Sequence, residues 1–201
     1  MTTIRITANC TLPPACVLYA AYDFGPRRTQ VWPAVRVEHL TVHELSETTA
    51  DATEGTPVGI GINWERCCYD WSEPGRVTAT VTDSNVYAHP GSSWQLSATP
   101  SQRGSRVEMV WQRTFRRNPR GLFSGTLFRI AGRPIFGRYA RQVIANLEAL
   151  ERNRSPHQMA RRPGGASGPR SSRTPTASPN TSTATSASRV RARACECRSI
   201  R

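Results

Sequence analysis

The sequence predicts an α+β domain in which a curved antiparallel sheet is covered by a long C-terminal helix. Runs of alternating polar and apolar residues recur between residues 3 and 115, and Pro- and Gly-containing turns separate them. An amphipathic helical stretch follows at residues 120–151. After Glu151 the chain becomes rich in Arg, Ser, Thr and Pro and has few large apolar side chains. We therefore predict a folded domain at residues 1–151 and a disordered tail at residues 152–201.

The N-terminal part of the chain predicts one strand and then two short helices. Residues 3–10 alternate between apolar and polar side chains, as a half-buried strand does. A helix is expected from about Pro13, because proline is favoured in the first helical turn, and Gly25 and Pro26 end it. A basic segment at residues 27–35 predicts a second helical turn. A hairpin is expected next, with strands at residues 37–45 and 48–53.

Four more strands are predicted, at residues 58–64, 77–82, 93–98 and 107–115. Each alternates between apolar and polar side chains, so the sheet should have one buried face and one solvated face. The helix at residues 120–151 is the element long and apolar enough to cover the buried face. Gly132 and Pro134 interrupt its pattern, because proline removes a backbone donor and disfavours the α conformation at its predecessor. We expect a kink or a restart near Arg133.

Composition limits the classes of protein and the compartment. The chain contains 27 basic and 14 acidic residues, and all the basic ones are Arg. No run of about 18 apolar residues occurs, so no membrane-spanning helix is expected. The N-terminus lacks the apolar run of a secretory signal, and the six Cys are therefore expected to be free thiols in a reducing compartment. These features predict a cytoplasmic protein.

Several short stretches resemble a known superfamily. They are Asp23-Phe24 after the first helix, Val31-Trp32-Pro33 after the second, residues 71–120, and the final helix with Tyr139, Val143, Ile144 and Leu147. Together with the order of the elements, they resemble the START-related helix-grip fold, also called the SRPBCC superfamily. Residues 71–120 also look like bacterial members described as polyketide cyclase/dehydrase or lipid-transport proteins. The resemblance covers about residues 2–151 and specifies fold better than chemistry.

The resemblance implies a hydrophobic cavity between the sheet and the C-terminal helix. Its expected ligand is a lipid, a polyketide or a similar small molecule, bound without a cofactor or a metal. By alternation, eleven side chains are predicted to line it: Ile62, Trp64, Val81, Trp94, Leu96, Met109, Trp111, Phe136, Tyr139, Val143 and Leu147. The alternative is that these side chains simply fill the core, as most buried apolar residues do.

A second hypothesis is a cofactor-free enzyme of the polyketide cyclase/dehydratase type acting in the same cavity. Arg66 and Arg113 share strand parity with inward-facing Trp residues, so either could polarise a carbonyl, as could Tyr139. The alternative is that these Arg residues lie at strand ends and reach solvent, or that a bulge near Cys67-Cys68 reverses the strand parity. Glu65 has the opposite parity and is expected outside, which leaves no paired carboxylates for acid/base catalysis.

Other chemistry is not indicated. His39 and His43 are too far apart on a strand to share a metal, and Cys195 and Cys197 lack two further ligands. Eight Arg and no acid occur between Arg113 and Arg141. This Arg-rich patch, together with the tail, predicts weak contact with anionic surfaces. Nucleic acid is not an expected partner, because no aromatic residue interrupts the tail for base stacking.

Overall fold

A computed structural model describes residues 1–58 and 61–159 of the chain, with side chains described up to Arg154. Most of the predicted disordered tail therefore lies outside the described residues. Its first part is helical, because the C-terminal helix continues past Glu151 to Met159. The predicted domain boundary thus falls inside a helix.

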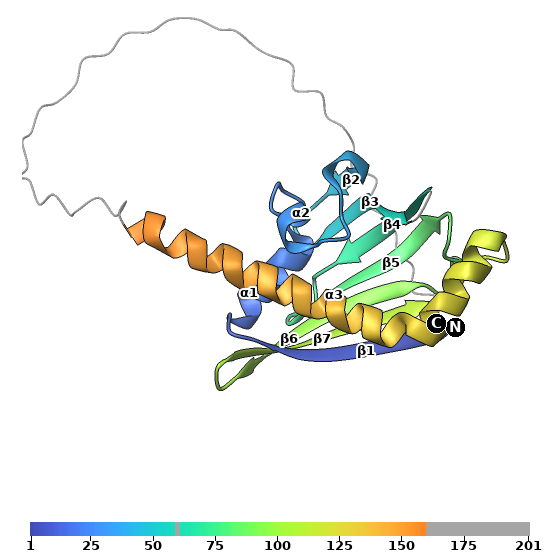
Figure 1. Cartoon of the computed structure of the whole chain (residues 1–201). Coiled ribbons are helices and arrows are strands. Elements are labelled where there is room, and N and C mark those ends of the chain that lie inside the picture. The colour runs from blue at the N-terminus through green and yellow to red at the C-terminus, as the bar shows by residue number, and fades with distance from the viewer. Residues whose placement is uncertain (59–60, 160–201) are drawn as a thin grey trace, which may run out of the picture.

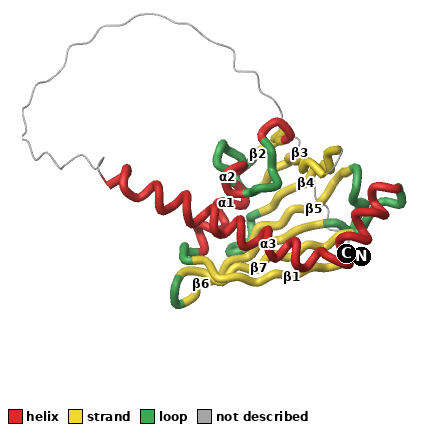
Figure 2. Tube along the Cα trace, in the orientation of Figure 1, coloured by secondary structure: helices red, strands yellow, loops and turns green. Residues whose placement is uncertain are grey.

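Seven antiparallel strands form one sheet with the order β1-β7-β6-β5-β4-β3-β2. Each strand from β2 to β7 pairs with the strand that follows it in the chain, and β1 pairs with β7, the last strand. The sheet curves around α3, which runs across one of its faces (Figures 1 and 2). The predicted α+β class and its helix-grip architecture are confirmed. The strands are β1 Thr2–Cys10, β2 Leu40–Leu45, β3 Thr49–Val58, β4 Gly61–Asp70, β5 Arg76–Ser84, β6 Ser93–Ser101 and β7 Gly104–Arg113.

Two short helices, α1 (Pro14–Tyr22) and α2 (Arg28–Val31), follow β1 as predicted, and a single 3-10 turn, η1 (Val37–His39), precedes β2. Proline occupies the first turn of α1, where its missing N–H costs no helical hydrogen bond. Trp32 fixes α2 onto α1, since its indole Nε1–H donates to the carbonyl oxygen of Ala20 at 2.8 Å. The two helices close the end of the sheet beside α3 (Figure 1).

Helix α3 (Pro119–Met159) is held against the sheet mainly by its later part. Ala140, Val143, Ile144 and Leu147 are buried and join the main hydrophobic core. Burying large apolar side chains contributes about 1.5–3 kcal/mol each before entropy is subtracted. This apolar stripe is therefore what fixes the helix in place.

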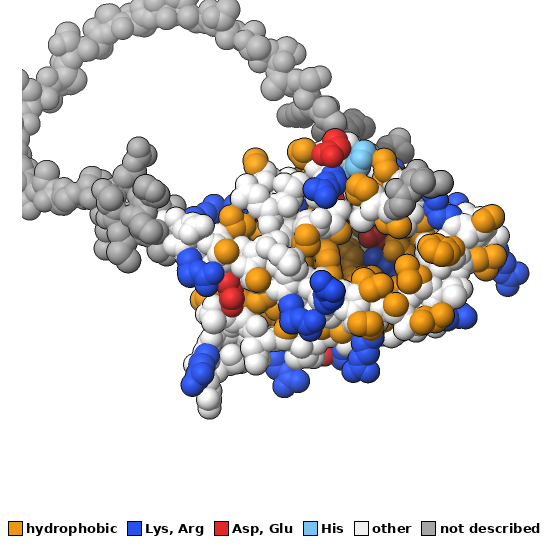
Figure 3. Space-filling view, viewed as in Figure 1, with side chains coloured by type: hydrophobic (Ala, Val, Ile, Leu, Met, Phe, Trp, Pro, Cys, Tyr) orange, Lys and Arg blue, Asp and Glu red, His pale blue; other side chains and the backbone are white. Residues whose placement is uncertain are grey.

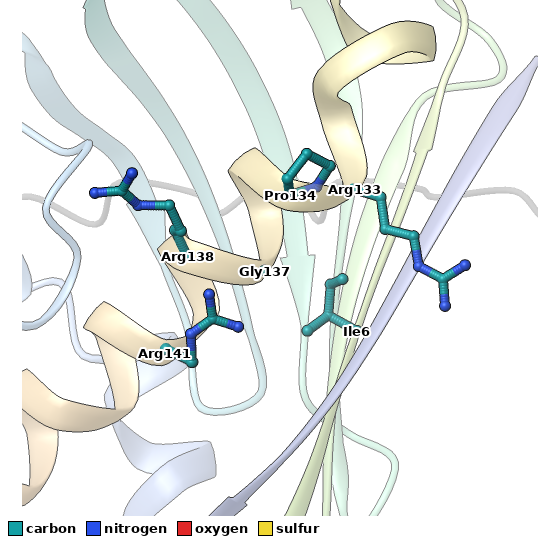
Figure 4. A pocket seen from close by; sticks show the side chains of 6 residues that line it. All are labelled: Ile6, Arg133, Pro134, Gly137, Arg138 and Arg141. Carbon is teal, nitrogen blue, oxygen red and sulfur yellow. The ribbon is translucent and has the colours of Figure 1, made fainter.

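The helix changes direction around Gly132 and Pro134 without being interrupted (Figures 1 and 4). The expected discontinuity near Arg133 is thus a bend and not a restart. A Cβ at Gly132 would lie 2.4 Å from Cδ1 of Ile4, so a larger residue at this position would require the end of the Ile4 side chain to move. The bend therefore lies close to β1.

Strand β2 forms one edge of the sheet and is irregular. Its pairing with β3 shifts between Val42 and Glu44, as at a β-bulge. Val42 and Leu45 are both exposed. At this edge the sheet ends in a short strand with a broken register.

Glu148 ties α3 to the end of β1. Its Oε1 accepts hydrogen bonds from the backbone N–H and the hydroxyl of Thr11, at 2.7 and 2.8 Å. Partial burial alone would raise the pKa of Glu148, but the Thr11 hydrogen bonds outweigh it and the pKa is lowered. A lowered carboxyl pKa stabilises the fold above its ordinary value of 4.5 and ceases to do so as the pH falls through the lowered value.

We predict that Glu148→Gln lowers the free energy of unfolding by about 1 kcal/mol at neutral pH, because a charge-assisted hydrogen bond is replaced by a neutral one. The difference from the wild type should vanish below the lowered pKa, where Glu148 is protonated. Urea unfolding at neutral and at acid pH measures both effects. Glu47→Gln, at an exposed position between β2 and β3, is the control and should change neither. An equal loss in both variants would contradict the assigned role.

Candidate functional site

A cavity of about 330 Å³ lies between the sheet, α2 and the bent first part of α3. Trp94, Met109 and Trp111 line it from the sheet, and Phe128, Phe136 and Tyr139 line it from the helix. In Figure 3 it appears as a hollow bordered by hydrophobic side chains, with acidic and basic side chains visible inside. The cavity is therefore mainly apolar but contains charged groups.

Six of the eleven predicted lining residues border this cavity: Trp64, Trp94, Met109, Trp111, Phe136 and Tyr139. Four others do not line it and are buried in the core, namely Val81, Leu96, Val143 and Leu147. Leu96, Val143 and Leu147 belong to the main hydrophobic core, and Val81 belongs to a second cluster on the sheet. Ile62 does not line it either, and 37% of its surface is exposed.

Ile62 lies elsewhere than predicted because one predicted strand crosses the boundary between β3 and β4. The predicted strand at residues 58–64 spans the end of β3 at Val58 and the start of β4 at Gly61. Cys67 and Tyr69 cluster with Ala52 and Ala79 on the core face. Strand alternation therefore places Glu65 and Asn63 on that same face, and both line the cavity. The expectation that Glu65 lies outside was wrong.

Arg66 does not line the cavity. Its guanidinium group bonds the carboxylate of Asp51, with Nε 2.8 Å from Oδ1. Asp51 alternates with Ala50 and Ala52, which face the core, so the ion pair lies on the opposite face of the sheet. This removes Arg66 as a candidate catalytic residue.

Arg113 lies at the cavity with only 3% of its surface exposed. Its Nη2 donates to Oε1 of Glu65 at 3.2 Å, and its Cζ lies 4.4 Å from the ring centre of Tyr87. Nη2 also lies 3.1 Å from Oε2 of Glu65, but among the described residues Arg113 Nε and Nη1 and Glu65 Oε2 make no hydrogen bond. Burial raises the pKa of Glu65, outweighing the lowering by Arg113. The pair is thus close but incompletely bonded.

A second ion pair in the cavity wall was not predicted. Arg28, with 2% of its surface exposed, donates from Nε to Oε1 of Glu54 at 2.7 Å and from Nη2 to the hydroxyl of Tyr69 at 3.1 Å. The Tyr69 hydroxyl in turn donates to Glu54 at 2.9 Å. Arg28 also stacks over Phe24, with Cζ 4.3 Å from its ring centre. The sequence offered one sign of this ion pair, because Arg28 is a charged residue in the same short segment as the apolar Val31 and Trp32.

Tyr139 stands among aromatic side chains at the wall formed by α3. Its ring centre is 6.4 Å from those of Trp32 and Trp111, and Trp111 also contacts Phe136 at 4.6 Å. Burial raises the pKa of Tyr139, so its phenol remains protonated at neutral pH and can donate a hydrogen bond. The predicted roles of Tyr139 and Arg113 in chemistry stay predictions.

A shallower groove lies outside the cavity, between β1 and α3. Ile6 and Pro134 contribute apolar surface to it, and Arg133, Arg138 and Arg141 surround it. In Figure 4 the three guanidinium groups point in different directions. They do not converge on one point, as an anion site would require.

Within residues 1–58 and 61–159, no three His, Cys, Asp or Glu side chains are grouped so that they could hold a metal ion. None of the helices described there combines the length and the hydropathy needed to cross a membrane.

Solved structures of known proteins share this architecture. The chain has the START-related helix-grip fold. It superposes on the Zhui aromatase/cyclase from Streptomyces sp. R1128 with a TM-score of 0.56 and 11% identity, over 82% of this chain and 99% of that one. For a START superfamily protein from Mycobacterium smegmatis the TM-score is 0.50 and the identity 8%, over 78% and 98% of the two chains.

The di-domain aromatase/cyclase StfQ of the steffimycin pathway gives a TM-score of 0.58 at 10% identity, and the match covers 77% of this helix-grip chain but only 51% of StfQ. No protein-family model matches the sequence, and no curated protein matches it. Identities this low establish the helix-grip fold alone.

We predict that Arg28→Met lowers the free energy of unfolding by about 3–5 kcal/mol, because it leaves Glu54 charged and without its cation in a buried position. Combining it with Glu54→Gln should recover at least half of that loss. Urea unfolding of the single and double variants measures the coupling. Arg5→Met, which breaks the exposed Arg5–Glu108 pair, is the matched control and should cost less than about 1 kcal/mol. Similar losses from Arg28→Met and Arg5→Met would contradict the role of Arg28.

Proposed function

We propose that this protein binds a hydrophobic small molecule, lipid-like or polyketide-like, in the cavity between the sheet and α3. The cavity itself carries the proposal. Its volume of about 330 Å³ lies in the range of small-molecule sites, and aromatic and aliphatic side chains supply most of its wall. An apolar ligand placed there would leave water and contact several aromatic rings at once.

The mouth of the cavity supports the same proposal. Phe123 and Leu127, on the first part of α3, line the cavity and are also 68% and 43% exposed. Leu122 and Ile130 are exposed on the same part of the helix. An apolar ligand entering here would meet apolar surface before it reaches the interior. Contact of this Arg-rich region and the tail with an anionic surface stays a prediction, as does a cytoplasmic location.

The proposal predicts that filling the cavity weakens binding. Ala34, between α2 and η1, lines the cavity, so Ala34→Phe should occupy part of its volume. We expect affinity for a hydrophobic fluorescent dye to fall at least about tenfold, as when a pocket loses the room for part of its ligand. Ala145→Phe, at an exposed position on α3, is the control and should bind dye like the wild type.

Native mass spectrometry of protein purified from its host provides an independent measurement, since a bound ligand adds a defined mass. Protein that is consistently empty and excludes the dye would overturn the proposal. Equal dye binding by the wild type and Ala34→Phe would place the bound dye elsewhere.

A second candidate function is cofactor-free cyclisation or dehydration of a polyketide-like substrate, favoured by Glu65 and Arg113. A carboxyl with a raised pKa is suited to general acid/base catalysis, and a guanidinium group beside it can stabilise an enolate. Tyr139 adds a protonated hydroxyl on the opposite wall. The cavity would hold the flexible substrate folded, so that proximity lowers the barrier.

For this candidate, a linear thioester with repeated 1,3-dicarbonyl units serves as the substrate, and cyclised or dehydrated product is measured by mass spectrometry. We expect Arg113→Ala to lower kcat/KM by about 100-fold and Tyr139→Phe by about tenfold, the usual effects of removing a charge-stabilising or proton-donating group. Arg66→Ala, on the other face of the sheet, should leave turnover unchanged. Full turnover by both cavity variants would exclude these roles.

A further inference from the structure

The charged pair formed by Arg113 and Glu65 is unusual for a cavity wall because its hydrogen bonding is incomplete. Among the described residues, Nε and Nη1 of Arg113 and Oε2 of Glu65 make no hydrogen bond, although Oε2 lies 3.1 Å from Nη2 of Arg113 within the ion pair. The Arg28–Glu54 pair in the same cavity differs, since Arg28 bonds Glu54, Tyr69 and the carbonyl oxygen of Ala21. Unpaired buried donors and acceptors are costly, and a bound group that satisfies them gains affinity.

The two members of the pair also differ in the hydrogen bonds that they can make. Arg113 can only donate hydrogen bonds, and an ionised Glu65 can only accept them. Their charges cancel, so the site has no net attraction for an ion. A bound group must therefore supply an acceptor to Arg113 and a donor to Glu65 side by side, and it should be neutral.

Accessibility decides which partner a ligand meets first. The side chain of Glu65 is 21% exposed and that of Arg113 only 4%. Arg113 is held between Glu65 and the ring of Tyr87, which leaves it little freedom. A rotation of the Glu65 carboxylate would turn Oε2 toward a ligand donor and uncover N–H groups of Arg113 for the adjacent acceptor.

We propose that the Arg113–Glu65 pair is a polar subsite that selects hydrophobic ligands bearing a neutral, paired acceptor and donor, such as a primary carboxamide or a hydroxyl beside a carbonyl. This inference rests on the proposed function, because it names the class of ligand that the hydrophobic cavity takes. It discriminates against carboxylates, which would place a second negative charge against Glu65. It also discriminates against simple ketones, which leave Glu65 Oε2 without a donor.

Three naphthalene derivatives of nearly equal shape test the proposal: the β-substituted primary carboxamide, methyl ketone and carboxylate. Each is titrated against the wild-type full-length protein containing a hydrophobic dye, and displacement gives its affinity. We expect the carboxamide to bind about tenfold more tightly than the ketone, and the ketone more tightly than the carboxylate, since a site built for a donor rejects an isostere lacking it.

Glu65→Gln supplies the decisive comparison. It removes the negative charge and leaves Arg113 as an unpaired cation, so the carboxylate should rise from weakest to strongest ligand. A merely structural role for Glu65 would change affinity for all three compounds alike and would not reverse their order. Arg66→Gln, which alters an ion pair on the other face of the sheet, is the matched control and should keep the wild-type order.

The outcomes separate the subsite from the proposed function. The expected order in the wild type and its reversal in Glu65→Gln support the subsite. The same order in both proteins, or dye binding that no compound displaces, overturns the subsite and leaves the hydrophobic cavity standing. Failure of the wild type to bind dye or any compound overturns the proposed function itself. Should Glu65→Gln not fold, equal wild-type affinities for carboxamide and ketone would still overturn the subsite.

Discussion

The cavity depends on the fact that α3 packs closely against the sheet along only part of its length. Val143, Ile144 and Leu147 are buried in the shared core, whereas Leu122 and Ile130, nearer the start of the helix, remain exposed. The bend near Pro134 separates the closely packed part of the helix from the part that remains exposed (Figure 4). The later part of the helix supplies the stability, which allows the earlier part to border an open space. A straight helix packed along its whole length would leave no such space.

Because the cavity is largely enclosed, a charged side chain in its wall needs an oppositely charged partner. Arg28 and Arg113 are both almost fully buried, so each needs a carboxylate close by. Glu54 and Glu65 provide these from neighbouring positions on β3 and β4, and the cavity keeps a balanced charge. The two pairs differ in completeness, since one is saturated with hydrogen bonds and the other is not. Structural and ligand-selecting roles can thus be divided between two chemically similar pairs.

Sequence patterns predicted the architecture well because it follows from periodicity. Alternation identified the later strands, and the apolar stripe with Val143 and Leu147 identified the covering helix. The end of the helix was less predictable, because polar residues after Glu151 continue a helix whose position is already fixed by its buried part. Local composition does not reveal such continuation.

The candidate site was only partly predictable, and the errors came from β4. Its inward face carries Asn63 and Glu65 beside Cys67, so polarity could not identify which side faced the protein interior. Val58 pairs with Gly61, so inward-facing positions change from even numbers in β3 to odd numbers in β4, and Arg66 faces outward. Arg28 was missed because its partners come from β3 and β4, far away in the sequence. In a strand that borders a cavity, polar residues can face inward, so the alternation of apolar and polar side chains no longer identifies the buried face.

The irregular register of β2 bears on how the protein behaves at high concentration. An open sheet offers backbone N–H and C=O groups along its edges, and a flat apolar edge strand can recruit a strand from another molecule. β2 carries exposed Val42 and Leu45, which would favour such pairing. The shift between Val42 and Glu44 breaks the regular spacing of the backbone groups that a foreign strand would need. This irregular register therefore disfavours pairing with a foreign strand at the edge of the sheet farthest from β1.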